Sequence, residues 1–312
     1  MQRAKGKVKG RFAPIIYKIT RFSSTAVREV LILTNNFKSG KGRALPTLCT
    51  LHFDLCTYKA FTINFAIERS IPMSQIILIA SGKGGSGKSS FVTGVGRALT
   101  SLGKKVLAVD CDIGLRSLDI MFDVTEKVVF DWGDLLLERC DAQQAIIKGE
   151  IDLLAAPRSF SDDFTPEATA DLFRSFADEY DYILLDAPAG IDRGFQLAAS
   201  AADRAIVIST PDYVCVRSCG RAFDELRRMG KEDVRLVINM FEVKPVCKRR
   251  LLNIDQCIDE TGVQLLGVVP RDYNISFSTV TGKKPPSDSP STLAFSRISR
   301  RITGQRIPLI CE

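Results

Sequence analysis

Short apolar runs alternate with segments of helical periodicity along most of this 312-residue sequence, and this alternation limits the fold more than any other feature. Runs this short, bounded by turn residues and without strict alternation, are typical of strands covered on both faces. We expect strands at Ile76–Ala80, Val106–Val109, Leu153–Ala155, Ile183–Leu185, Ala205–Ile208, Leu236–Ile238 and Leu265–Val269. The repetition predicts an α/β fold, a doubly wound and mostly parallel sheet with helices on both faces.

Helices are predicted where apolar residues recur at helical spacing, and a glycine or proline marks one end of three of them. The expected helices carry Phe91, Val95, Ala98, Leu99 and Leu102 before Gly103; Leu172, Phe173 and Phe176 after Pro166; Val216, Cys219, Phe223 and Leu226 before Gly230; and the segment Leu293–Ile302. Ligands of doubly wound folds bind at the carboxyl ends of the strands. The residues that follow each apolar run are therefore the first candidates for a site.

Charge divides the chain at about residue 72. Residues 1–72 hold 13 of the 43 Lys and Arg but only 3 of the 36 Asp and Glu, so the rest of the chain is slightly acidic. The leader could be a transit peptide, a basic disordered arm that touches membrane or nucleic acid, or no part of the native protein. We favour the third interpretation, because Met73 directly precedes the first strand. The body, residues 73–312, is then one domain with no overall charge bias towards nucleic acid.

Composition excludes several classes of protein. Hydrophobic residues make up 45% and charged residues 25%, as in a soluble globular protein, and no apolar run is long enough to span a bilayer. The nine cysteines are scattered without a CxxC pair, which favours reduced thiols in the cytoplasm over zinc ligands or disulfides. The only histidine, His52, lies in the leader. Chemistry in the body must therefore proceed without histidine.

A glycine-rich loop follows the first apolar run and precedes a helix. It reads Ser81-Gly82-Lys83-Gly84-Gly85-Ser86-Gly87-Lys88-Ser89-Ser90 and fits the phosphate-binding P-loop. Glycines let successive N–H groups point at phosphate oxygens, and the helix N-terminus adds partial positive charge. Lys88 can reach the terminal phosphates, and the Ser89 hydroxyl can ligate magnesium. The alternative is a glycine-rich turn that fits by accident; its place between strand and helix favours a P-loop NTPase that binds ATP.

Aspartates follow two other predicted strands. Asp110 and Asp112 end the second strand, and Asp186 ends the fourth. Side chains at neighbouring strand ends can share a magnesium ion with Ser89, so we predict Asp110 and Asp186 as metal-binding residues. Asp112 is the predicted group that orients the attacking water, and Lys88 is a second predicted catalytic residue. Each aspartate alone could instead cap a helix or form a turn.

The loop and the aspartate segments resemble the MinD family of septum-site-determining ATPases, within the MinD/ParA class. Lys83 is the extra lysine of that class's deviant P-loop, and Asp110-Cys111-Asp112-Ile113-Gly114-Leu115-Arg116 and Asp186-Ala187-Pro188-Ala189-Gly190-Ile191 are similar to its switch regions. The resemblance covers residues 73 to about 302. It implies a magnesium-dependent ATPase that forms an ATP-bridged homodimer, with Lys83 as a further catalytic residue that reaches the partner's nucleotide. It also implies adenine contacts at Asn239 and around Pro270 and Asp272, although Asn239 could equally be a turn residue.

The resemblance weakens at two surfaces that family members use for partners. Members usually end in an amphipathic helix that inserts into membrane, whereas Pro308 interrupts the apolar residues Ile307, Leu309 and Ile310 here. We expect a final core helix and a weak or absent anchor, in a protein that is cytoplasmic or peripheral on the inner face of the membrane. Ser218 and Gly220 replace residues that are commonly acidic, which leaves the identity of a division-inhibitor or activator partner open.

Other members of the class remain alternatives. A ParA-like DNA-segregation ATPase would need a basic face, which the slightly acidic body does not indicate. A flagellar-number or other localisation regulator would use the same switch with different partners. An interaction module without hydrolysis fits less well, because both switch aspartates are present. Amide-forming synthetases share the loop but need a substrate pocket that the sequence does not show.

Overall fold

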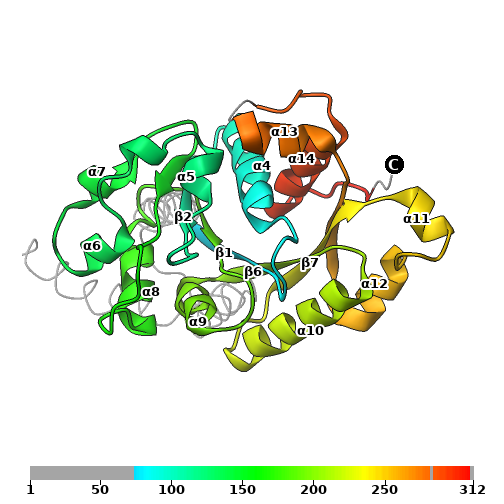
Figure 1. Ribbon diagram of the computed structural model, residues 1–312, viewed down its shortest axis with the longest axis horizontal. Coiled ribbons are helices and arrows are strands. Elements are labelled where there is room, and N and C mark those ends of the chain that lie inside the picture. Colours follow the sequence, from blue (N-terminus) through cyan, green and yellow to red (C-terminus); the bar gives the residue numbers. More distant parts are fainter. Residues whose placement is uncertain (1–73, 282–283, 310–312) are drawn as a thin grey trace, which may run out of the picture. The chain divides into compact units, whose positions relative to one another are not determined.

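The computed structural model describes residues 74–281 and 284–309 (Figure 1). The basic leader at residues 1–72 and Met73 lie outside the described residues, and so does Ile310 of the tail. The predictions that concern them therefore remain predictions.

One sheet of eight strands organises the described part of the chain. Its order is β3-β4-β2-β5-β1-β6-β7-β8, and neighbouring strands run parallel except β3 and β4, which are antiparallel. The strands are β1 (Gln75–Ala80), β2 (Val106–Asp110), β3 (Ile146–Ile147), β4 (Asp152–Leu154), β5 (Tyr182–Asp186), β6 (Arg204–Ser209), β7 (Val234–Phe241) and β8 (Leu265–Pro270). All seven predicted strands and the mostly parallel sheet are confirmed; the two-residue β3 was not predicted.

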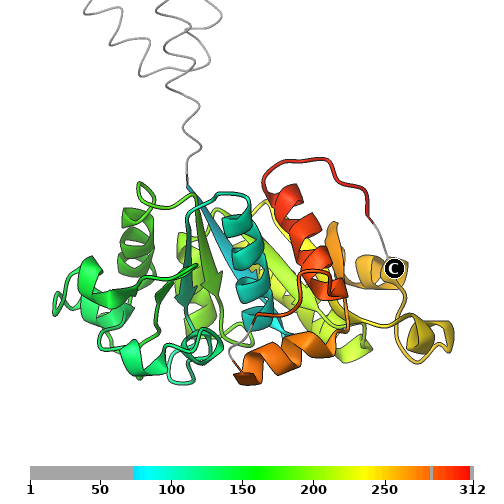
Figure 2. The ribbon, with the colours of Figure 1, turned by 90° about the horizontal axis from the view of Figure 1, so that it is seen from above.

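Helices connect the strands and cover both faces of the sheet (Figures 1 and 2). They are α4 (Lys88–Ser101), α5 (Leu118–Met121), the 3-10 helix η1 (Thr125–Lys127), α6 (Trp132–Leu136), α7 (Ala142–Ala145), α8 (Pro166–Ser175), α9 (Arg193–Ala201), α10 (Tyr213–Arg228), α11 (Val243–Cys247), α12 (Ile254–Thr261), α13 (Tyr273–Thr281) and α14 (Pro290–Ile302). The four predicted helices are confirmed as α4, α8, α10 and α14. None of the helices in these ranges is long and apolar enough to cross a membrane.

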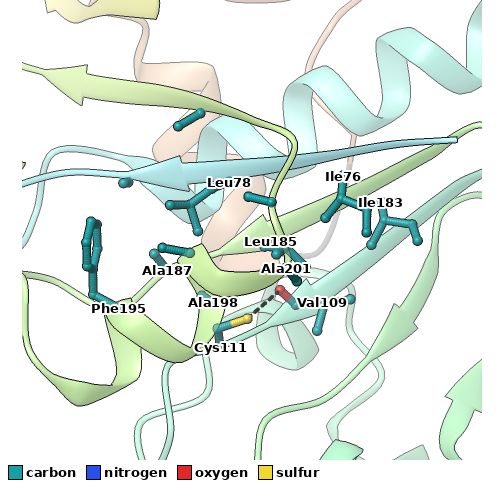
Figure 3. Close-up of a cluster of buried hydrophobic side chains, with 14 of the residues drawn as sticks. Ile76, Leu78, Val109, Cys111, Ile183, Leu185, Ala187, Phe195, Ala198 and Ala201 are labelled. Carbon is teal, nitrogen blue, oxygen red and sulfur yellow. Dashed lines mark hydrogen bonds between the residues drawn. The ribbon is translucent and has the colours of Figure 1, made fainter. Parts of the chain in front are cut away.

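The two faces of the sheet have separate cores. Ile77 and Ile79 of β1 belong to the core that α4 and α14 complete, where Phe91 and Phe295 meet edge to face at 5.9 Å. Residues in alternate positions, such as Leu78, belong to the opposite core, to which helices α8, α9, α10 and α12 contribute. Figure 3 shows the part of this core that lies beside α9. Because successive strand residues point to opposite faces and both faces are covered, the strands read as continuous apolar runs.

Helix α14 is a core helix, as the sequence predicts. Its buried side chains face α4 and the sheet, and Arg301 near its end holds the following segment. The Arg301 guanidinium donates to the carbonyls of Leu266 in β8 (2.9 Å) and Ile307 (3.0 Å), and a third nitrogen donates to the Pro308 carbonyl. Residues 305–309 have no helical structure, and Arg301 joins this segment to β8.

Candidate nucleotide-binding site

The P-loop lies between the end of β1 and the start of α4, at the carboxyl edge of the sheet. Gly85 and Gly87 have φ of 78° and 91°, a left-handed backbone that favours glycine, and Gly87 is the N-cap of α4. Gly82 is needed for another reason, since a Cβ there would lie 2.0 Å from the Ser218 carbonyl oxygen of α10. The loop is therefore shaped by its own turn and by the helix behind it.

Asn239 fastens the loop to the end of β7. Its Nδ2 donates to the Ser86 carbonyl at 2.8 Å, and a Cβ on Gly87 would lie 2.3 Å from the same nitrogen. The Asn239 side chain is buried. A role of Asn239 in holding the loop is thus visible, and the predicted adenine contact stays a prediction.

The two lysines of the loop occupy different environments. Lys88 is partly buried, and its Nζ lies 3.3 Å from the Ser81 hydroxyl, on the inner side of the loop. Lys83 is exposed at the rim, where its charge helps to lower the pKa of Asp212. That pKa would be raised by burial, but the Thr210 hydroxyl, the Cys215 amide and Lys83 together outweigh the burial.

Asp110 is the last residue of β2, and its carboxylate accepts hydrogen bonds from backbone amides of the loop that follows. Its Oδ1 accepts the Asp112 amide at 2.9 Å, and its Oδ2 accepts the amides of Ser117 and Leu118 at 2.8 and 3.0 Å. Burial raises the pKa of Asp110, and these three hydrogen bonds oppose the rise. Asp110 therefore forms a turn, the alternative role that the sequence allowed. Its predicted role in binding magnesium stays a prediction.

Asp186 and Asp112 complete the acidic side of the site. The end of β5 lies beside β2, so that Asp110 and Asp186 are register partners. Burial, followed by the charge of Asp110, raises the pKa of Asp186 to about 7, against the opposing effect of Ser89 and Lys88. Burial also raises the pKa of Asp112, and Lys88 opposes it. Lys88 thus acts on both carboxylates, and the predicted strand-end residues do converge.

The residues around Ser89 fit a magnesium ion that is shared with phosphate. Asp186 Oδ1 is buried and has no hydrogen-bond partner among the described residues, and the Ser89 hydroxyl lies 2.9 Å from the Ser117 hydroxyl. In the described ranges no cluster of three or more Asp, Glu, His or Cys could hold a metal alone. Magnesium usually keeps several waters and takes one or two carboxylates plus substrate phosphates, which is the donor set that these residues offer.

A cavity of about 290 Å³ adjoins the P-loop. It is lined by loop residues together with residues at or after the ends of β6, β7 and β8. Of the residues outside the loop, the sequence placed only Arg271 in the site, within the stretch around Pro270 and Asp272. The lining residues are Lys83, Gly84, Gly85, Ser86, Thr210, Pro211, Asp212, Cys215, Met240, Leu251 and Arg271. Position after a strand end was a signal for Thr210 and Arg271, whereas no local pattern pointed to Leu251 or Cys215.

Two predicted adenine-binding residues lie beside this cavity and do not line it. Pro270 ends β8, next to the lining residue Arg271. The Asp272 carboxylate is occupied by protein donors: Oδ1 accepts from the Asn274 amide at 2.9 Å and Oδ2 from the Ser291 hydroxyl at 2.6 Å. Ser90 lies in the first turn of α4. Their contacts with a nucleotide stay predictions.

Comparison with known proteins agrees with this geometry. Residues 77–285 match the family model described as CobQ/CobB/MinD/ParA nucleotide binding domain. The septum site-determining protein MinD of Bacillus subtilis is 35% identical over 246 residues, covering 76% of this chain and 92% of that protein.

Solved structures give the same result. MinD in the MinC:MinD cell division protein complex of Aquifex aeolicus superposes with a TM-score of 0.69 and 31% identity, covering 76% of this chain and 99% of that one. MinD of Pyrococcus horikoshii complexed with Mg-ADP has a TM-score of 0.65 and 26% identity over 74% of this chain and 96% of that one. The chain therefore belongs to the MinD family of septum site-determining proteins, within the CobQ/CobB/MinD/ParA nucleotide-binding domain family.

Proposed function

We propose that this protein binds ATP and Mg²⁺ at the carboxyl edge of the sheet and hydrolyses ATP to ADP and phosphate, as a switch in the placement of the cell-division site. The observation that carries the proposal is that Asp110 and the buried Asp186 are register partners at neighbouring strand ends, beside a P-loop whose Lys88 opposes the rise in the pKa of Asp186 and Asp112. Family membership supports the cellular role, and the Mg-ADP complex of the P. horikoshii relative supports the ligand.

Each side chain has a role that follows from its position. The P-loop amides and the α4 N-terminus hold the phosphates, and Lys88 neutralises charge that develops on the transferred group. Ser89, Asp186 and Asp110 would hold Mg²⁺, the last two through waters. The metal, when bound, supplies charge neutralisation at the phosphate oxygens. Asp112, half-buried near Lys88, orients the attacking water.

Assembly and partners form the second part of the proposal. Lys83, exposed at the rim of the cavity, is placed to contact a nucleotide held by a second copy of the chain, so ATP would bridge a homodimer. The Aquifex relative is solved in complex with MinC, and we propose a division regulator as partner here too. Helix α10 carries Ser218 and Gly220 at positions where the family often has acidic residues, so the recognition chemistry would differ. We place the protein in the cytoplasm, with at most weak peripheral contact with the inner face of the cell membrane.

The test of hydrolysis is phosphate release by the full chain with ATP and Mg²⁺, in the wild type and in Asp112→Ala. We expect magnesium-dependent release in the wild type and a fall of about 100-fold in the variant, with ATP still bound, because the variant loses only the group that orients water. Nucleotide binding is followed separately with a fluorescent ATP analogue. Equal phosphate release by the two proteins would remove Asp112 from the mechanism, and no release by the wild type would contradict the ATPase proposal.

A further inference from the structure

Helix α6 begins with Trp132, which contacts Asp110 at the end of strand β2. The indole Nε1 of Trp132 donates to the Asp110 carbonyl at 2.9 Å, and both residues are only 1% exposed. The ring packs against Phe164 and Phe173, with centroids 5.0 and 5.9 Å away. The hydrogen bond is thus enclosed in an aromatic cluster, where water cannot replace it.

The carbonyl that accepts from Trp132 belongs to Asp110, whose carboxylate organises the loop of residues 111–117 after β2, here called the switch loop. The Asp110 carboxylate accepts amides from both ends of the loop, at Asp112 and at Ser117. Fixing the carbonyl of Asp110 fixes the direction in which its side chain leaves the strand. The position of Trp132 is therefore transmitted to the loop that carries Asp112.

The start of helix α6 contacts the loop after β2 at a second residue, Arg116. Arg116 donates from Nη2 to Asp131 Oδ2 at 2.7 Å, and both side chains are mostly buried, at 14% and 15% exposed. Arg116 has φ of 46°, a left-handed conformation that is unfavourable for a residue other than glycine. Asp131 is also the N-cap of α6, accepting the Gly133 amide at 3.0 Å. The Arg116–Asp131 ion pair at the start of α6 therefore stabilises the loop at a residue whose backbone conformation is unfavourable.

We propose that Trp132 is a positioning residue for ATP hydrolysis, which sets the Asp110 carboxylate and the loop carrying Asp112 through its hydrogen bond to the Asp110 carbonyl. The Arg116–Asp131 ion pair is a second contact that positions the same loop. The inference rests on the proposed ATPase function. Trp132 does not itself contact the nucleotide in this proposal. It sets the positions of the Asp110 and Asp112 carboxylates.

The kinetic test is Trp132→Phe, which keeps an aromatic ring in the cluster and removes the N–H group. We expect kcat to fall about three- to tenfold with KM for ATP changed less than twofold, because one buried hydrogen bond is lost and the P-loop is untouched. The matched control is Phe173→Leu, which loosens the same cluster without removing the N–H group. It should lower the melting temperature and keep kcat, measured well below both melting transitions. An unchanged kcat in Trp132→Phe, or kcat losses in both variants that follow their melting temperatures, would overturn the inference.

A spectroscopic test is independent of turnover, because Trp132 is the only tryptophan of the 312 residues. Its fluorescence should change when Mg-ADP is titrated into the wild type, since the metal-binding strand end and the indole are joined by one hydrogen bond. Asp131→Asn, which keeps the helix cap and removes the charge facing Arg116, should reduce that change. Nucleotide binding with a constant emission spectrum would refute the coupling. Because binding of the fluorescent analogue is measured separately, this outcome is distinguishable from failure of the ATPase proposal.

Discussion

Two glycines of the P-loop meet different surroundings, although both belong to the same pattern in the sequence. A Cβ on Gly82 would lie 2.0 Å from the Ser218 carbonyl oxygen, in the backbone of α10. A Cβ on Gly84 would meet only the Ala189 Cβ, at an ordinary 3.8 Å, and Gly84 is not among the residues with positive φ. At the scale of single residues, the requirement for Gly82 thus comes from helix packing, before any phosphate is bound.

We predict that Gly82→Ala destabilises the protein in the absence of nucleotide, whereas Gly84→Ala does not. Backbone atoms cannot move aside cheaply, so Gly82→Ala should cost about 1–3 kcal/mol, as overpacking in a core does. For a domain of this size that corresponds to a melting temperature lower by roughly 2–10 °C. Thermal unfolding followed by circular dichroism gives the comparison. Equal melting temperatures for the two variants would show that α10 yields and that the packing argument is wrong.

At the scale of elements, Asp272 connects two helices near the site. Its Oδ1 accepts the Asn274 amide in α13, and its Oδ2 accepts from the hydroxyl and, at 3.3 Å, the amide of Ser291 in α14. Burial would raise the pKa of Asp272, but hydrogen bonds from Ser291, Asn274 and Ser289 outweigh it and lower the pKa. The ionised carboxylate is therefore the form that the fold stabilises.

We predict that Asp272→Ala lowers the free energy of unfolding by about 1 kcal/mol, as the loss of a helix cap does. Since the folded pKa lies below the unfolded one, this contribution is present above about pH 4 and disappears as the pH falls through the folded value. Urea unfolding at pH 7 and at pH 3 measures the difference between variant and wild type. A difference of the same size at both pH values would contradict the charge-based account. The predicted contact of Asp272 with the nucleotide is tested separately, by the ATP affinity of the same variant.

The sequence predicts those parts of this fold that have a period or a fixed spacing. The strands are apolar runs, the long helices repeat their apolar residues, and the P-loop keeps its spacing, so each was visible in one dimension. The two-residue strand β3 and the five-residue α6 are too short to show a period. The contacts of Trp132 with Asp110 and of Asn239 with Ser86 join residues 22 and 153 positions apart, and only the packing of whole elements creates them.

At the scale of the whole molecule, the two lysines of the P-loop differ in which nucleotide they can contact, the one bound by their own chain or one bound by a second chain. Lys88 lies inside the loop beside Ser81, where the phosphates of a nucleotide bound to the same chain would lie. Lys83 lies exposed on the rim. In the proposed homodimer, the charge of Lys83 on the rim would act on the nucleotide of the second chain, and assembly would then depend on ATP.

We therefore predict that Lys83→Ala abolishes ATP-dependent dimerisation while the variant keeps its fold and its nucleotide affinity. The measurement is light scattering with Mg-ATP, made in an Asp112→Ala background so that hydrolysis does not dissolve the dimer. Lys104→Ala is the matched control, because Lys104 loses only a half-exposed ion pair with Asp181 before β2, at the opposite edge of the sheet. The control should dimerise as its parent does, since such pairs contribute little and lie away from the rim. A full dimer in the Lys83 variant would mean that ATP joins two chains through other groups, and that Lys83 acts only within its own site.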